Sequence, residues 1–142
     1  MEKISRESLS SPRPPVTAGD IMRPALTAVE PNDHLAAAAY LMKHKDASAL
    51  VVVDGAEVGR PVGVITEADI VQAVADGKNL NDVRILALMT SDPTVVRTTT
   101  SVHEAARAMV AGRFRHLPVV GNDDHLRGMI DILEICDALL DC

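Results

Sequence analysis

The sequence predicts a mixed α/β (α+β) fold in which two β-α-β-β-α repeats pack sheet to sheet with pseudo-two-fold symmetry. Three observations predict it: an internal repeat, an amphipathic helix pattern in each copy, and a β-branched run after each of those helices. The chain has 142 residues, of which 47% are hydrophobic, and this is enough for one domain with a substantial core.

The repeat becomes visible when Met22 is aligned with Met89, 67 positions later. In this register Met42 meets Met109, and the run Leu50-Val51-Val52-Val53 meets Leu117-Pro118-Val119-Val120. The first copy is then two residues longer in a turn, after which Gly63-Val64-Ile65 meets Gly128-Met129-Ile130. One copy alone has too little interior to be stable, so two copies are expected to pack together and leave clefts between them.

Each copy divides into the same elements. The first copy predicts a helical turn, an extended piece, a helix, two strands and a helix: Ala18 to Met22, Leu26 to Val29, a helix bearing Leu35, Ala38, Ala39 and Met42, Val51 to Val53, Val62 to Ile65, and Glu67 to Asp76. The second copy predicts the same series: Val83 to Met89, Thr94 to Arg97, a helix bearing Val102, Ala105, Ala106 and Met109, Val119 to Val120, Arg127 to Ile130, and Leu133 to Leu140. The apolar spacing i, i+3, i+4, i+7 indicates the first helix of each copy, and β-branched residues favour the strands.

The chain is expected to have three parts. Residues 1–15 are rich in serine and proline without apolar periodicity, and this is typical of a disordered tail. Residues 16–78 form the first copy and residues 79–142 the second. Together, residues 16–142 would fold as one module.

Composition excludes several classes of function. The net charge of −6 disfavours duplex nucleic acid, and an aromatic fraction of 1% disfavours a stacking surface for single strands. Membrane-spanning runs and a signal peptide are not apparent, and Cys136 and Cys142 lack the spacing of a zinc site, so we expect a cytoplasmic protein without a metal. A convergent catalytic set and a glycine-rich phosphate loop are also not apparent, so we expect no enzyme.

The segment Thr66-Glu67-Ala68-Asp69 follows a strand and begins a helix. Thr66 and Asp69 have the spacing of a capping box, which alone would explain them. A hydroxyl and a carboxylate at a helix N-terminus also suit the hydroxyl groups of a ribose. In the second copy the same positions hold Asp131 and Glu134, which keep the capping pattern but lose the hydroxyl, so the second site is in doubt.

A local basic cluster, Arg113, Arg115 and His116, precedes the strand predicted to line the cleft of the second copy. The cluster is either a solvated surface or a small-anion site. In an acidic chain its position beside the cleft favours the second interpretation.

These motifs together resemble a tandem CBS-domain protein, a Bateman module, over roughly residues 16–141. The residues that carry the resemblance are Asp20-Ile21-Met22, Leu50-Val51-Val52-Val53-Asp54, Gly63-Val64-Ile65-Thr66-Glu67-Ala68-Asp69-Ile70, Leu88-Met89-Thr90, Arg115-His116-Leu117-Pro118-Val119-Val120 and Gly128-Met129-Ile130.

The resemblance implies a non-catalytic regulatory module that binds AMP, ADP, ATP or S-adenosylmethionine in the cleft between the copies. It places the ribose on Thr66 and Asp69. It places phosphate on Arg115, His116 and Arg113, and adenine near Thr27, Ala47, Ser48 and Ile65. It also implies a homodimer with an unidentified protein target. The alternative is a dimeric interaction module that binds a protein partner and no ligand.

Overall fold

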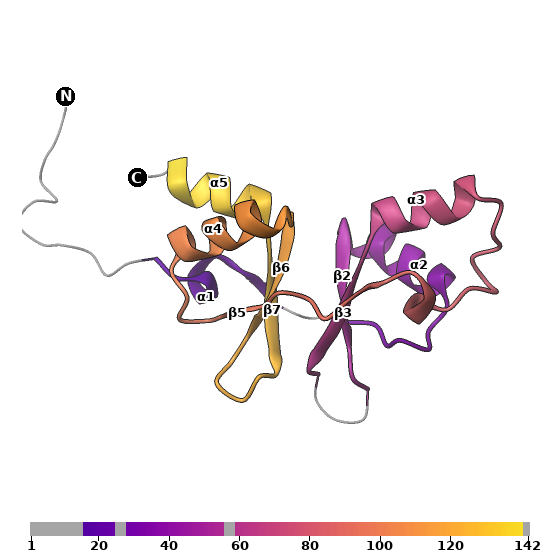
Figure 1. The fold of residues 1–142 in the computed structure, drawn as a ribbon, viewed down its shortest axis with the longest axis horizontal. Helices are drawn as coiled ribbons and strands as arrows, with labels where there is room; N and C mark the ends of the chain where they lie inside the picture. Colours follow the sequence, from indigo (N-terminus) through magenta and orange to yellow (C-terminus); the bar gives the residue numbers. More distant parts are fainter. Residues whose placement is uncertain (1–15, 25–27, 56–58, 141–142) are drawn as a thin grey trace, which may run out of the picture.

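The structure, a computed structural model, describes residues 16–24, 28–55 and 59–140. Its element order along the chain is α1 (Ala18–Ile21), β1 (Arg23–Pro24), α2 (Leu35–Lys45), β2 (Ala49–Val53), β3 (Pro61–Thr66), α3 (Glu67–Ala75), η2 (Ile85–Ala87), β4 (Thr90–Ser91), β5 (Val96–Arg97), α4 (Val102–Gly112), β6 (His116–Val120), β7 (Leu126–Asp131) and α5 (Ile132–Leu140). Helices and sheets alternate as the repeat predicted, so the α+β fold class is confirmed (Figure 1). The predicted tail and Thr27 lie outside the described residues.

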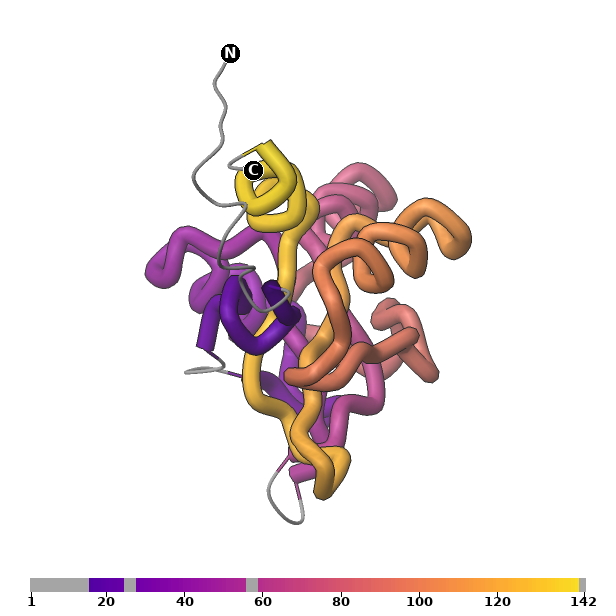
Figure 2. The backbone as a smooth tube through the Cα atoms, turned by 90° about the vertical axis from the view of Figure 1, so that its left-hand side faces the viewer, coloured from indigo at the N-terminus to yellow at the C-terminus, as the bar shows by residue number. Residues whose placement is uncertain are grey.

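Two sheets lie side by side in the middle of the molecule (Figure 1). One has the strand order β1-β7-β6-β5 and the other the order β2-β3-β4. The β2–β3 and β6–β7 hairpins have matching antiparallel registers, since Leu50 pairs with Ile65 and Leu117 pairs with Ile130. The β6–β7 hairpin extends to one end of the molecule (Figure 2), and near that end the N–H of Leu126 donates to the carbonyl oxygen of Gly59 at 2.8 Å.

Each half has its own apolar core of aliphatic side chains. The predicted helix faces supply much of it, because Leu35, Ala38 and Met42 of α2 are buried in one core. Their counterparts on α4, Val102, Ala105 and Met109, are buried in the other. Equivalent positions of the two copies are therefore buried in equivalent cores, and this shared packing is the physical basis of the sequence repeat.

The opening segment of each sequence copy packs on the opposite half. The side chain of Ala18 in α1 is buried in the core of the second half, and β1 pairs with β7. Likewise Ile85 of η2 is buried in the core of the first half, and β4 pairs with β3. Each structural half is therefore completed by residues from the other copy, an exchange that the linear repeat did not predict.

Helix termini follow the capping chemistry expected from the sequence. Ser101 caps α4 by accepting a hydrogen bond from the Glu104 N–H at 3.1 Å. Gly77, with φ of +78°, follows the last turn of α3, as a glycine in the left-handed conformation commonly does. At α1, a hydrogen bond from the backbone N–H of Thr17 lowers the pKa of the Asp20 carboxyl group. Within the described ranges, no helix is long and apolar enough to cross a bilayer.

Candidate functional site

A cavity of about 450 Å³, here called cavity 1, opens where the two halves meet. Its volume lies within the usual range for small-molecule sites. The first half supplies Thr66 from the end of β3, and the second half supplies Arg113, Arg115 and His116 from the α4–β6 junction. Thr66, which is predicted to bind ribose, and the predicted basic cluster therefore line the same cavity.

Thr66 and Asp69 form a reciprocal capping box at the start of α3. The Asp69 Oδ2 atom accepts from the Thr66 N–H at 2.8 Å and from the Thr66 hydroxyl at 3.0 Å, and Thr66 Oγ1 accepts from the Asp69 N–H at 3.3 Å. The capping interpretation is therefore correct, and both side chains remain partly exposed. Thr66 lines cavity 1, whereas Asp69 lies one turn further along the helix and does not line it.

The backbone of the α4–β6 junction positions the basic cluster. Arg113 ends α4 in the left-handed conformation, with φ of 58°, and turns the chain toward the cavity. Its repeat partner Asp46 has φ of 51° at the end of α2, so this turn belongs to the fold and not to the site alone. The carbonyl oxygen of Arg115 then accepts from the N–H of Ile132, and this bond ties the cluster to the start of α5.

His116 is the half-buried member of the basic cluster, with a side chain 15% exposed. Its Nε2 atom lies 3.0 Å from Ser48 Oγ and 3.2 Å from Asp131 Oδ2. Because a bare ring nitrogen would repel the carboxylate, this geometry favours a hydrogen on Nε2. Both ring neighbours contact the same nitrogen, so the three side chains do not form the relay of a catalytic triad.

A second cavity of about 270 Å³, here called cavity 2, lies on the other side of Ser48, His116 and Asp131. It is lined by the second-copy counterparts of the capping box and by two cations, Arg23 and Lys45. Glu134 Oε1 accepts from the Asp131 N–H at 2.6 Å, and Glu134 Oε2 lies 3.5 Å from Arg23 Nε. The acid at this position is thus already paired, unlike Asp69, whose hydrogen bonds all go to Thr66 within the described residues.

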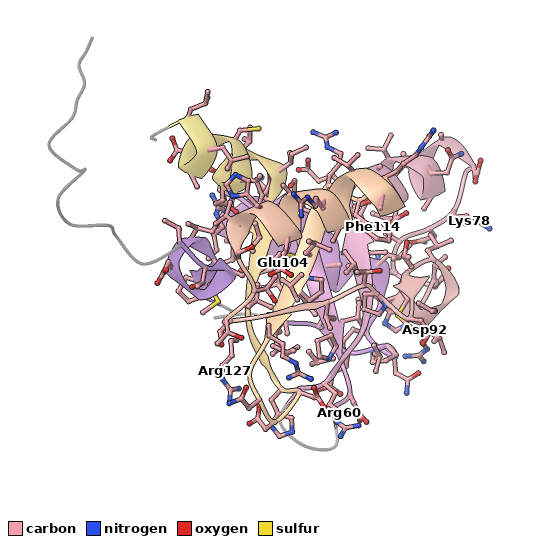
Figure 3. All side chains as sticks on the ribbon, turned by 60° about the vertical axis from the view of Figure 1, so that its left-hand side comes forward. Arg60, Lys78, Asp92, Glu104, Phe114 and Arg127 are labelled. Atoms are coloured by element: carbon pink, nitrogen blue, oxygen red, sulfur yellow. The ribbon has the colours of Figure 1, made fainter. Side chains whose placement is uncertain are left out.

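The predicted adenine residues are only partly brought together. Ser48 lines both cavities, but Ala47 lines only cavity 2, and Ile65 is 0% exposed in the core. Instead, the second-copy counterparts of Thr27 and Ala47, which are Thr94 and Phe114, line cavity 1. Phe114 follows the end of α4 (Figure 3).

The exchange of opening segments explains this difference. Thr94 follows β4, the strand that crosses to pair with β3 beside Thr66. The repeat alignment pairs Thr94 with Thr27 and Phe114 with Ala47, so it could have identified both residues as candidates. It does not indicate which copy contributes residues to which cavity. Thr90, Pro93, Glu67, Ala68 and Val64 also line cavity 1 and were not predicted.

Comparison with protein families gives two matches, both to the CBS domain, at residues 18–76 and 82–141. The chain belongs to the CBS domain family. The two matches in tandem make it a CBS pair, a Bateman module, and the predicted resemblance is confirmed. In the described part of the chain, no group of three or more His, Cys, Asp or Glu side chains is placed to hold a metal ion.

Solved CBS-pair structures share this fold. A CBS domain protein of Pyrobaculum aerophilum complexed with AMP is 26% identical, with a TM-score of 0.79, over 89% of this chain and 97% of that chain. The CBSX2 protein in complex with AMP is 30% identical, with a TM-score of 0.70, over 88% of this chain and 96% of that one.

Among curated relatives, a 17.7 kDa protein of Acidianus ambivalens is 39% identical over 113 residues, which are 80% of this chain and 66% of the relative. A protein of Methanopyrus kandleri is 31% identical over 84% of this chain, which spans 62% of that relative's length. The CBS pair thus spans about two thirds of these relatives.

Proposed function

We propose that this CBS pair is a non-catalytic sensor that binds an adenosine nucleotide in cavity 1. The observation that carries the proposal is the meeting, in one cavity of about 450 Å³, of Thr66 from one half with Arg113, Arg115 and His116 from the other. The AMP complexes of two similar CBS proteins support the same ligand class.

The chemistry of the cavity suits the parts of such a ligand. Asp69 Oδ1 carries no hydrogen bond to the described residues, so it is available to accept from ribose hydroxyl groups while Oδ2 keeps the cap. The two arginines supply donors for phosphate oxygens, and His116, whose Nε2 contacts Asp131, lies beside them. Adenine would lie among Thr94, Pro93 and Phe114 and not beside Ala47.

The first test is the thermal midpoint of the purified protein with AMP, ADP, ATP, S-adenosylmethionine and GMP as a control. A ligand at a hundred times its dissociation constant adds about 2.7 kcal/mol of stability, which is several degrees for a domain of this size. We expect a rise that depends on adenine and is absent in Asp69→Ala. Glu134→Ala is the matched control, because it removes the N3 carboxylate of the other copy and leaves cavity 1 intact.

A flat response across the panel would instead favour a ligand-free interaction module. The observation that favours this second function is the exposure of apolar side chains on two helices, Val71 (65%) and Val74 (58%) of α3, and Leu133 (71%) and Leu140 (84%) of α5. Both helices lie along the upper edge of the molecule in Figure 1. These faces would join two copies of the chain as a homodimer, which sedimentation equilibrium would detect.

A further inference from the structure

Three side chains among the described residues line both cavities: Ser48, His116 and Asp131, here called the polar wall. Ser48 comes from the first half, while His116 and Asp131 are register partners at the ends of β6 and β7. The contacts of 3.0 Å and 3.2 Å at His116 Nε2 join the two halves through this wall. Any anion that reaches His116 from cavity 1 therefore also meets Asp131.

Asp131 places a negative charge at the basic end of cavity 1. Its side chain is 25% exposed, and Oδ1 accepts from the Leu133 N–H at 2.8 Å while Oδ2 faces His116. The other carboxylate lining cavity 1, Glu67, is exposed, so water and salt screen its charge more strongly.

The charges lining the basic end can be counted. Arg113 and Arg115 are permanently cationic, whereas the donor of His116 is already engaged by the Asp131 carboxylate. A phosphate monoester carries about −1.5 to −2 at pH 7, which two arginines balance. Each further phosphate adds negative charge that has no free cation among the described cavity 1 residues and that Asp131 repels.

We propose that Asp131 sets the number of phosphates that cavity 1 accepts, favouring a nucleoside monophosphate over the di- and triphosphates. The inference rests on the proposed function of cavity 1 and names the ligand class more narrowly. Asp131 acts on specificity through charge and through His116. The first copy has the uncharged Thr66 at the same repeat position, so the charge is not needed to begin a helix there.

The test is the affinity of adenosine, AMP, ADP and ATP for the wild type and for Asp131→Asn, measured by calorimetry at fixed ionic strength. Asparagine caps a helix as well as aspartate does, so the bond from the Leu133 N–H and the fold should persist. We expect the wild type to bind AMP at least about tenfold more tightly than ATP, since unfavourable like-charge contacts cost several kcal/mol. In Asp131→Asn the affinity for ATP should rise about tenfold, while that for adenosine should change by less than about twofold.

Glu134→Gln is the matched control. Glu134 lies one turn further along the same helix and lines only cavity 2, and glutamine keeps the capping bond to the Asp131 N–H. Its four affinities should equal those of the wild type. Asp131→Thr introduces the residue that the first copy has at this position. It should give the same gain in affinity for ATP, which would show that the gain is not specific to asparagine.

The outcomes separate the two proposals. Two results would overturn this inference alone, provided that AMP binds the wild type in a manner that depends on Asp69. Either the wild type shows no preference for AMP over ATP, or both Asp131 variants keep the preference of the wild type. An equal gain for adenosine, AMP and ATP in those variants also overturns it, because the charge would then not select by phosphate number. A wild type that binds no adenosine compound overturns the proposed function and this inference together.

Discussion

The two copies begin their last helices with related pairs of residues that have diverged in what they offer a ligand. In the first copy, Thr66 and Asp69 bond to each other and Thr66 lines cavity 1. In the second, Asp131 accepts from the Leu133 N–H, and Glu134 accepts from the Asp131 N–H and pairs with Arg23. Both arrangements satisfy the first N–H groups of a helix, so both serve folding.

The difference teaches that capping and binding constrain these positions unequally. A cap needs an oxygen at the first position and an acceptor three residues later, and either threonine or aspartate can supply the first. A ribose needs a hydroxyl and a carboxylate free to accept from it. The second copy can cap a helix but does not offer this pair of groups to a ribose. Its carboxylates are paired instead, Asp131 with His116 and Glu134 with Arg23.

The largest expected effect comes from moving the second-copy pair into the first copy. The double substitution Thr66→Asp with Asp69→Glu should keep the start of α3 while removing the ribose contacts. We expect nucleotide affinity to fall about 10- to 150-fold, the equivalent of one hydrogen bond to a charged group, with thermal stability nearly unchanged. Titration calorimetry and thermal denaturation of the same preparation measure the two quantities separately.

The conservative control is Thr66→Ser, which keeps both the hydroxyl and the cap. Its nucleotide affinity should stay within a few-fold of the wild type. If the double variant bound nucleotide as tightly as Thr66→Ser, then the pair would serve folding alone in both copies.

The sequence could predict the elements, the two cores and the capping box, because these depend on local patterns. The apolar spacing of α2 placed Leu35 and Met42 in a core, and the repeat supplied the same prediction for α4. Whether α1 packs on its own copy or on the other is a long-range choice, and no local pattern encodes it. For that reason the sequence could not place Ala47, a predicted adenine contact, which lines cavity 2 and not cavity 1.

Burial also limited the prediction of the site. The family resemblance implied that Ile65, which precedes Thr66 in an apolar strand, lies near the adenine, but its side chain is buried in the core and is 0% exposed. Asp131 was expected only as the counterpart of Thr66. Its role in the wall between the cavities depends on the approach of Ser48 from the other half, 83 residues away in the chain.

The next effect concerns the two glycines where the exchanged segments cross the strands. A Cβ atom at Gly128 would meet the carbonyl oxygen of Arg23, a backbone atom that cannot move without shifting β1. At Gly63 it would meet Met89 Sδ first, at 2.6 Å, and the thioether can rotate away. We expect Gly128→Ala to cost about 1–3 kcal/mol and Gly63→Ala less, measured by urea denaturation. Equal costs would show that the two crossings are held with the same rigidity.

The smallest effect compares the starts of α2 and α4. The first N–H group donates to a backbone carbonyl oxygen in both helices, Leu35 to Val83 and Val102 to Val16, but the following N–H groups are satisfied by different means. Ser101 caps α4 with its side chain, whereas His34 makes no side-chain bond at the start of α2. There the N–H groups of Leu35 and Ala36 donate to the carbonyl oxygens of Val83 and Leu80, at 2.8 and 3.1 Å.

Because backbone atoms replace the cap at α2, His34→Ala should change the free energy of unfolding by less than about 0.5 kcal/mol, while Ser101→Ala should lower it by about 1 kcal/mol. Urea denaturation of the two variants gives both numbers. A substantial loss in His34→Ala would mean that the segment before η2 does not hold the start of α2 in solution. The exchange of opening segments would then be looser at that helix than the hydrogen bonds to Leu80 and Val83 imply.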